Sequence, residues 1–186
     1  MAAPDVIPWR RGILSHTTRS IYQGRILQLG IESLTLPNGT PLDLEIVRHP
    51  GGAAVVAVDE RNHVCLLRQY RHASGGWLWE LPAGKLEPDE PPQTTARREL
   101  LEEAGIQADQ WQPLGDILVT PGFCDEVIHL FLARGLTQLA AQPGAHEVIE
   151  VHWIPFQQAL AWVFDGTLRD AKTMLGLTLS EKLVSC

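Results

Sequence analysis

A stretch between residues 84 and 106 constrains the fold most strongly, because it predicts the bounds of one helix. Pro91 and Pro92 suit the first turn of that helix, where a missing backbone N–H costs little. Gly105 suits the position just after the last turn, where glycine readily takes a left-handed conformation. We therefore expect a helix that begins at Pro91–Pro92 and ends at about Ala104.

Three glutamates of this helix, Glu99, Glu102 and Glu103, are predicted to share one side of it. At 3.6 residues per turn they fall within roughly 100° of one another. The adjacent stripe is apolar and can face a core: Ala96, Leu100 and Ala104. Like charges at these spacings destabilise an isolated helix, and a divalent cation would turn that repulsion into a ligand set suited to Mg²⁺ or Mn²⁺. Neighbouring glutamates more often form a solvated acidic face, so that interpretation stays open at this point.

The segments on either side of the helix read as strands, turns and two later helices. Before it, extended chain is expected over 17–22, 25–36, 41–49, 52–58 and 63–70, a hairpin turn over 37–40 and an irregular stretch over 73–92. After it, strands are expected over 111–119, 127–133 and 147–154, and helices over 155–164 and 170–183. Four aromatic residues are assigned to the core: Trp153, Phe156, Trp162 and Phe164. The pattern predicts a mixed α/β fold, and 186 residues can be organised by one hydrophobic core.

Composition limits the partners of the chain. Its formal net charge of −7 argues against nucleic acid, because nucleic-acid binders concentrate Lys and Arg. No apolar run approaches the roughly 20 residues of a membrane span, and the N-terminus lacks a signal-peptide core. We therefore expect a cytoplasmic protein with no membrane partner. Cys65, Cys124 and Cys186 have no metal-ligand spacing and are interpreted as free thiols.

With Gly84 and Glu90, the helix completes the pattern GX5EX7REUXEEXGU, in which U is an aliphatic residue, and no position departs from it. This segment resembles the Nudix box of the Nudix hydrolase family. The resemblance implies an α/β/α sandwich with a mixed sheet and a small N-terminal antiparallel β-sheet. It implies an N-terminal strand segment over residues 1–49 and a Nudix hydrolase domain over residues 50–186. Glu90 and Arg98 resemble the pair that ties the box loop to the helix.

The same resemblance implies a metal site. Its ligands would be Glu99, Glu103 and the backbone carbonyl of Ala83, and Glu102 would assist. Mg²⁺ is the expected cofactor, and Mn²⁺ is the second choice. Such a cation neutralises the oxygens of a diphosphate and lowers the pKa of a bound water, which is the chemistry that diphosphate hydrolysis needs.

Phrases outside the box resemble the ADP-ribose pyrophosphatase subfamily. They are Arg68–Arg71, Trp79–Gly84 and the loop Thr120–Glu126 with its Pro121. The implied reaction converts ADP-ribose, a small nucleoside diphosphate derivative, to AMP and ribose 5-phosphate. GDP-mannose, NADH and dinucleoside polyphosphates are alternative substrates, because the box recognises the diphosphate and not the base. A non-catalytic Nudix-fold nucleotide-binding module is an alternative of another class, and the intact acidic set argues against it.

Three residues are predicted to contact substrate by the same resemblance. Arg71 is assigned to the diphosphate or the terminal ribose, and Glu45 to adenine. Glu80 is assigned to the metal shell or to an oriented water, and it could equally hold its loop by hydrogen bonds. Trp77 and Trp79 could stack on adenine, but packing is the favoured interpretation.

The general base is predicted on a late acidic loop. Glu147 matches the second glutamate of the corresponding loop in ADP-ribose pyrophosphatases, whereas Ala145 departs from the first. Glu126 and Glu102 are competing candidates for the base. His146 is a weaker candidate, because a loop histidine is more often simply solvated.

The N-terminal strands have a further implied role. In similar pyrophosphatases they form a small sheet that is exchanged or packed across a homodimer. The partner chain then helps to build the nucleotide pocket, so we expect a homodimer.

Overall fold

The computed structural model describes residues 17–144 and 146–184. The chain divides into two compact units: Met1–His49 with Thr120–Asp125, and Pro50–Val119 with Glu126–Cys186. A division into domains at residue 50 stays a prediction. Ala145 and Cys186 lie outside the described residues.

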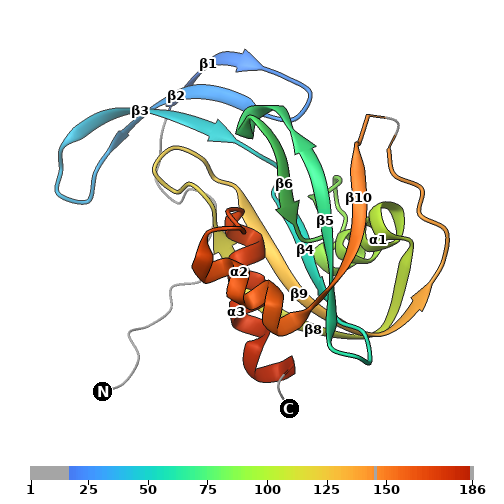
Figure 1. Cartoon of the computed structure of the whole chain (residues 1–186). Coiled ribbons are helices and arrows are strands. Elements are labelled where there is room, and N and C mark those ends of the chain that lie inside the picture. The colour runs from blue at the N-terminus through green and yellow to red at the C-terminus, as the bar shows by residue number, and fades with distance from the viewer. Residues whose placement is uncertain (1–16, 145, 185–186) are drawn as a thin grey trace. The chain divides into compact units, whose positions relative to one another are not determined.

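The first unit contains one antiparallel sheet of three strands in the order β1-β2-β3 (Figure 1). The strands are β1 (Thr17–Gln23), β2 (Gln28–Thr35) and β3 (Pro41–Arg48). The expected turn joins β2 to β3, with Gly39 at a φ of +85° and the Asn38 side-chain oxygen accepting a hydrogen bond from the Thr40 N–H at 3.1 Å. All seven residues of β1 are exposed. The backbone pairing of β1 with β2 therefore holds that strand in the sheet, since no described residue of β1 is buried.

The loop before β9 belongs to this first unit through Asp125. Arg48, the last residue of β3, forms ion pairs with Glu32 and with Asp125, the latter at 3.2 Å. The second Asp125 oxygen accepts a hydrogen bond from the His49 N–H at 2.8 Å. These contacts fix the C-terminal end of β3.

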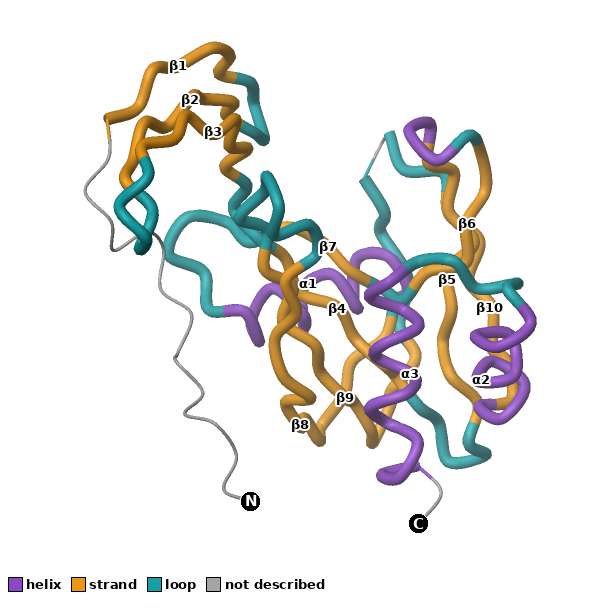
Figure 2. Tube along the Cα trace, turned by 90° about the vertical axis from the view of Figure 1, so that its left-hand side faces the viewer, coloured by secondary structure: helices purple, strands orange, loops and turns teal. Residues whose placement is uncertain are grey.

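The second unit holds a mixed sheet in the order β7-β4-β9-β8 and an antiparallel sheet in the order β10-β5-β6 (Figures 1 and 2). The strands β4 and β9 are parallel, and the remaining neighbours are antiparallel. The strand bounds are β4 Gly52–Ala57, β5 His63–Arg71, β6 Gly76–Glu80, β7 Ala83–Lys85, β8 Ile106–Leu118, β9 Val127–Gln138 and β10 Ile149–Pro155. The helices are α1 Pro92–Ala104, α2 Phe156–Asp165 and α3 Ala171–Val184, with a 3-10 turn at His72–Ser74.

The core lies on both faces of β4, whose six residues are all buried. Val55 packs in a cluster with Leu100 of α1, whereas its neighbour Val56 packs in a cluster with Phe156 of α2 and Leu177 of α3. Successive strand residues point to opposite faces, so α1 covers one face of the sheet and α2 and α3 cover the other. The predicted α/β/α sandwich with a mixed sheet is confirmed, as is the small N-terminal sheet.

Two details of the predicted strands are wrong. The stretch over 73–92 is not irregular throughout, because it contains β6 and β7, which pair with β5 and β4. The strand β8 begins at Ile106, directly after the helix, rather than at residue 111. Glycines and prolines lower the intrinsic strand preference of the stretch over 73–92, and pairing with neighbouring strands overrides that preference.

The aromatic assignments are partly confirmed. Phe156 is buried, and Trp162 packs against the same core cluster. Trp153 is 37% exposed and Phe164 is 80% exposed, so their assignment to the core is wrong. Phe164 lies in the last turn of α2, whereas the buried residues of that helix, Phe156, Ala159 and Leu160, lie in its first half.

Two of the three cysteines fall in described residues, and both are free thiols. Cys65 is buried, and burial together with the charge of Glu103 raises the pKa of its thiol to about 12. Among the described residues, no helix has the length and apolar character that crossing a bilayer requires.

Candidate metal and diphosphate site

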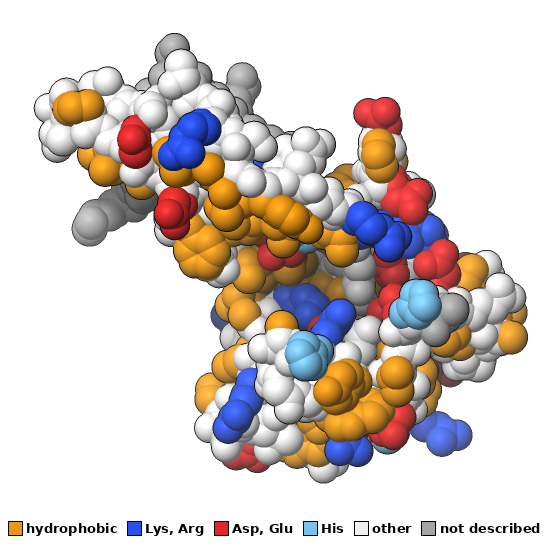
Figure 3. Space-filling view, turned by 90° about the horizontal axis from the view of Figure 1, so that it is seen from above, with side chains coloured by type: hydrophobic (Ala, Val, Ile, Leu, Met, Phe, Trp, Pro, Cys, Tyr) orange, Lys and Arg blue, Asp and Glu red, His pale blue; other side chains and the backbone are white. Residues whose placement is uncertain are grey.

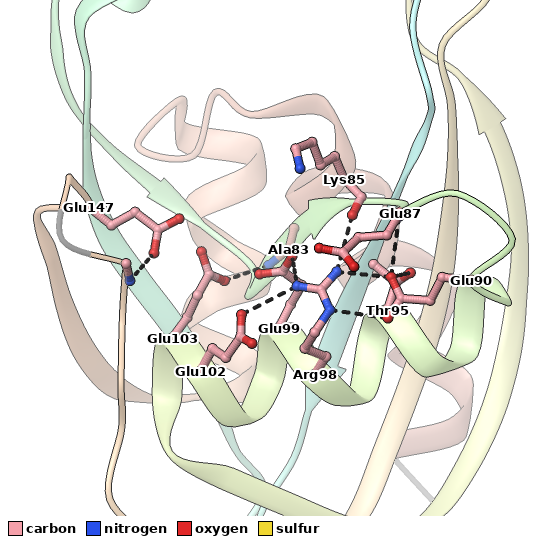
Figure 4. Close-up of polar contacts among 11 residues, drawn as sticks. Ala83, Lys85, Glu87, Glu90, Thr95, Arg98, Glu99, Glu102, Glu103 and Glu147 are labelled. Atoms are coloured by element: carbon pink, nitrogen blue, oxygen red, sulfur yellow. Dashed lines mark hydrogen bonds and ion pairs between the residues drawn. The ribbon is translucent and has the colours of Figure 1, made fainter. Parts of the chain in front are cut away.

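Helix α1 brings the predicted carboxylates together on one side (Figure 4). It is capped as expected: Gly105 has a φ of +65°, and its N–H donates to the Leu101 carbonyl at 2.9 Å. Glu99 and Glu103 are buried, at 8% and 2% exposure, whereas the Glu102 side chain is 45% exposed. A solvated acidic face would leave all three exposed. The burial of two of them therefore argues against the solvated-face interpretation.

The loop that holds Ala83 and Gly84 lies directly against this acidic side. The Ala83 N–H donates a hydrogen bond to Glu103 Oε2 at 2.8 Å. A Cβ atom added at Gly84 would lie 1.9 Å from Glu99 Oε1, so only glycine lets the carboxylate approach the loop this closely. The first glycine of the box is thus required by the position of the Glu99 carboxylate.

Arg98 links the loop to the helix. Its Nε and Nη2 donate to the two carboxylate oxygens of Glu90, at 3.1 and 3.0 Å, which confirms the predicted pair. Its Nη1 donates to Glu99 at 2.7 Å and to Glu102 at 3.3 Å, and Nη2 also reaches the Lys85 carbonyl at 3.3 Å (Figure 4). One guanidinium therefore fixes the loop and partly neutralises two carboxylates.

Burial and mutual repulsion set the charge state of the buried pair. Desolvation, together with the charges of Glu99 and Glu147, raises the pKa of Glu103 to about 8, and the hydrogen bond from Ala83 opposes this rise. Desolvation also raises the pKa of Glu99, against the opposing effect of Arg98. Glu90 behaves in the opposite way, because hydrogen bonds from Arg98 lower its pKa to about 2. Two buried carboxylates with raised pKa values are the local arrangement that a cation would stabilise.

The donor set suits a hard divalent cation. Within the described part of the chain, no three His, Cys, Asp or Glu side chains are grouped closely enough to hold a metal ion by themselves. Two buried carboxylates, Glu99 and Glu103, nevertheless lie beside the Ala83–Gly84 loop, which can add a backbone carbonyl oxygen. Oxygen donors of this kind are the ones that Mg²⁺ and Mn²⁺ prefer.

The candidates for the general base lie in different places. Glu147 lies on the exposed loop before β10, at the Glu103 end of the acidic row formed by Glu99, Glu102 and Glu103 (Figure 4). Its carboxylate accepts a hydrogen bond from the Gly144 N–H at 2.8 Å. Its charge acts on both Glu99 and Glu103. His146 is an exposed neighbour, and Glu126 is a half-buried residue directly before β9.

The predicted substrate residues divide between the two units. In the second unit, Arg71 of β5 forms a two-pronged ion pair with the buried Glu80 of β6, with nitrogen–oxygen distances of 2.8 and 3.0 Å. Glu45 is an exposed residue of β3 in the first unit, paired in register with Ile31. Trp79 packs against His152 and Trp162, which supports packing over stacking on a base. Trp77 is 42% exposed.

Sequence reasoning missed a group at the start of α3. Lys172 donates to Glu80 Oε2 at 2.6 Å and pairs with Asp170 at 3.0 Å. Thr173 is fully buried, and its hydroxyl oxygen accepts a hydrogen bond from the Leu81 N–H at 2.9 Å. The only signal was local: Asp170 three residues before Thr173 is a typical helix N-cap. Nothing in that signal pointed to Glu80.

Charges of both signs are interspersed on the face of the molecule in Figure 3. Lys and Arg side chains lie between acidic and apolar ones, and no continuous basic surface covers this face among the residues shown in colour. The expectation that nucleic acid is not a partner stays a prediction.

The fold is an α/β/α sandwich in which a glutamate-bearing helix lies against a Gly-containing loop. Residues 48–175 match the family model described as the NUDIX domain. The chain therefore belongs to the Nudix family, and the predicted membership is confirmed.

Individual relatives cover most of the chain. A methanol dehydrogenase activator of Bacillus methanolicus is 38% identical over 171 residues, which span 89% of this chain and 92% of the relative. An ADP-ribose pyrophosphatase of Mycobacterium tuberculosis is 37% identical over 164 residues, 87% of this chain and 79% of the relative. A GDP-mannose pyrophosphatase of Cronobacter sakazakii is 37% identical over 153 residues, 73% of this chain and 80% of the relative.

Proposed function

We propose that this Nudix protein is a Mg²⁺-dependent hydrolase that cleaves the diphosphate linkage of ADP-ribose and releases AMP and ribose 5-phosphate. The observation that carries the proposal is the buried pair Glu99 and Glu103 against the Ala83–Gly84 loop, within an unbroken box. A module that only binds nucleotides has no need of two buried carboxylates at this cost in repulsion. Relatives named ADP-ribose pyrophosphatase, at 37% and 38% identity, support the substrate.

The metal would be held by Glu99, Glu103 and the Ala83 carbonyl, with Glu102 at the exposed edge of the set. When bound, Mg²⁺ neutralises diphosphate oxygens and lowers the pKa of a coordinated water. Mn²⁺ has the same preference for oxygen ligands and would replace it. Arg98 keeps Glu99 and Glu102 oriented and partly neutralised until the cation binds.

Glu147 is the proposed general base, because its side chain lies at the Glu103 end of the helix carboxylates (Figure 4) and its charge acts on both buried ones. Replacing Glu147 with Gln should lower kcat by more than replacing His146 with Asn, since general-base catalysis contributes about a hundred- to ten-thousandfold. The same comparison includes Glu126→Gln and Glu102→Gln. If His146→Asn gave the largest loss of kcat, the general base would be assigned to His146 instead.

Arg71 is proposed to contact the diphosphate or the terminal ribose, and Glu80 to hold Arg71 rather than the metal, since its carboxylate is bound on both oxygens. Glu45 is proposed to contact adenine. Arg71→Ala should therefore raise KM for ADP-ribose more than Glu45→Ala raises KM for the same substrate, because a charged contact is lost.

We further propose that the protein is a cytoplasmic homodimer joined through the N-terminal sheet. The described part of β1 has no buried residue, and its Ile21 and Tyr22 are 49% and 58% exposed. A second copy would cover these apolar side chains. Light scattering at micromolar concentration should give twice the chain mass, and Tyr22→Glu should shift the mass toward that of one chain. A wild-type mass of one chain would contradict the dimer.

The activity is tested with the purified full chain and Mg²⁺ on four compounds: ADP-ribose, GDP-mannose, NADH and a dinucleoside polyphosphate. Chromatography should show AMP from ADP-ribose at the highest kcat/KM. A higher kcat/KM for GDP-mannose would favour the second candidate, which the relatives named GDP-mannose pyrophosphatase support. Tight binding without any turnover would favour the binding module.

A further inference from the structure

A buried ion network lies behind Arg71. The Glu80 side chain is only 3% exposed, and three donors bind its carboxylate: Arg71 Nε at 2.8 Å, Arg71 Nη2 at 3.0 Å and Lys172 Nζ at 2.6 Å. Burial opposes ionisation of Glu80, but the two cations outweigh it and lower the pKa of the carboxyl group. Glu80 is therefore a buried anion that depends on both partners.

The second of these partners stands on an element that is itself fixed. Lys172 also pairs with Asp170 at 3.0 Å, and Asp170 caps α3 by accepting a hydrogen bond from the Thr173 N–H at 3.1 Å. The Thr173 hydroxyl oxygen accepts the Leu81 N–H, directly after Glu80. A Cβ added at Gly176, one turn later, would lie 2.7 Å from the Leu81 side chain. The start of α3 is thus held against the strand end that carries Glu80.

The network determines which part of Arg71 is available to a ligand. Its Nε and Nη2 are used by Glu80, whereas Nη1 has no hydrogen-bond partner among the residues that the structure describes. The Arg71 side chain is 42% exposed, and that of Lys172 only 12%. Arg71 therefore presents one fixed edge outward, while Lys172 remains behind it.

We propose that Lys172 is a positioning residue for this reaction: it holds the Glu80 carboxylate so that the Arg71 guanidinium keeps one orientation toward the anionic substrate. The inference deepens the proposed function and rests on it. Without Lys172, Glu80 Oε2 keeps only the single bond from Arg71 Nη2, and the pair can rotate. The Arg71 side chain then loses conformational entropy when the substrate binds, and this loss weakens the affinity for the substrate.

The first experiment measures steady-state kinetics of Lys172→Met with ADP-ribose and Mg²⁺. We expect KM to rise about tenfold while kcat changes less than about threefold, since a binding contact is loosened and the metal ligands are untouched. Lys182→Met is the matched control, because Lys182 is an exposed lysine on the same helix, roughly 15 Å further along it. Its KM should equal that of the wild type.

The second experiment tests whether the effect passes through Glu80. In a Glu80→Gln background KM is already raised, and adding Lys172→Met should raise it no further. This double variant also leaves no buried carboxylate unpaired, so it folds even if Lys172→Met alone does not. A further rise in the Glu80→Gln background would mean that Lys172 contacts substrate directly or acts only by packing, and it would overturn the proposal. So would an unchanged KM in Lys172→Met.

A third measurement does not depend on turnover. The ¹H–¹⁵N resonance of Arg71 Nε, assigned by its loss in Arg71→Ala, should be sharp in the wild type and Lys182→Met and broadened in Lys172→Met. If the wild type hydrolyses none of the compounds, the proposed function fails, and this resonance alone decides the inference. An unchanged Arg71 resonance in Lys172→Met would then refute the positioning role.

Discussion

The Ala83 N–H donates a hydrogen bond to Glu103 Oε2 at 2.8 Å, so the loop before the box glycine and the last glutamate of the box are joined directly. This bond places the Ala83 backbone within reach of the helix carboxylates. It also occupies one carboxylate oxygen of Glu103, which is the most buried of the three helix glutamates. The remaining oxygen is the one that a cation can take.

The replacement Glu103→Gln separates metal binding from folding. The amide oxygen of Gln can still accept the Ala83 N–H, and a buried group whose ionisation is costly without metal disappears. We expect kcat to fall about a hundred- to thousandfold and the melting temperature in EDTA to stay equal or rise. Glu87→Gln is the control, an exposed carboxylate of the same loop. Near-normal activity of Glu103→Gln would contradict the proposal that Glu103 is a metal ligand.

Gly84→Ala should damage the site more than the fold. The new Cβ would lie 1.9 Å from Glu99 Oε1, and the carboxylate would have to move because it is the end of a flexible side chain. A displacement of this size can cost about a hundredfold in rate, while unfolding free energy drops by about 1–3 kcal/mol. Gly122→Ala is the control, since a Cβ there meets nothing within 4 Å. Kinetics and urea denaturation measure the two effects, and full activity of Gly84→Ala would contradict the close approach.

The helix α1 was predictable because its signals are local. Pro91 at the start, Gly105 at the end and the period of the apolar residues all act within one segment, and the observed bounds are Pro92–Ala104. The roles of Glu99 and Glu103 came instead from resemblance to the family. Helical period alone left a solvated face as the more common alternative.

The contacts that the sequence could not predict join distant segments. Lys172 and Glu80 are 92 residues apart in the chain, and no local pattern relates them. The strands β6 and β7 were missed because they are short and lie among glycines and prolines, and only their pairing with β5 and β4 identifies them as strands. Phe164 was placed in the core by its apolar character, but it lies in the last turn of α2 and is 80% exposed.

Arg98→Lys should loosen the box loop although the charge is kept. The guanidinium binds Glu90 with two nitrogens and Glu99 with a third, and an ammonium cannot reproduce that fork. We expect a loss of about 1–3 kcal/mol in unfolding free energy, seen as a lower melting temperature, together with reduced kcat. Arg97→Lys is the matched neighbour, which stacks on Trp111 instead. Equal losses in the two variants would show that the fork around Arg98 has no special importance.

The raised pKa of Glu103 predicts how stability without metal depends on pH. The folded-state value is about 8, above the ordinary 4.5, so between these values the folded chain keeps a proton that the unfolded chain has lost. The contribution of Glu103 to the free energy of unfolding is therefore highest below about pH 4.5 and decreases as pH rises toward 8. This contribution is isolated by the difference in unfolding free energy between the wild type and Glu103→Gln, measured by urea denaturation in EDTA from pH 5 to pH 9. It should become progressively more unfavourable up to about pH 8 and then level off.

Excess Mg²⁺ should reverse this trend in the wild type, because the cation binds the carboxylate form and competes with the proton. The stabilisation by Mg²⁺ is therefore expected to be larger at pH 8 than at pH 6, and to be largely lost in Glu103→Gln at both values. Glu87→Gln should follow the wild type throughout. A Mg²⁺ effect that is the same at pH 6 and pH 8 in the wild type would mean that the cation does not bind at Glu103.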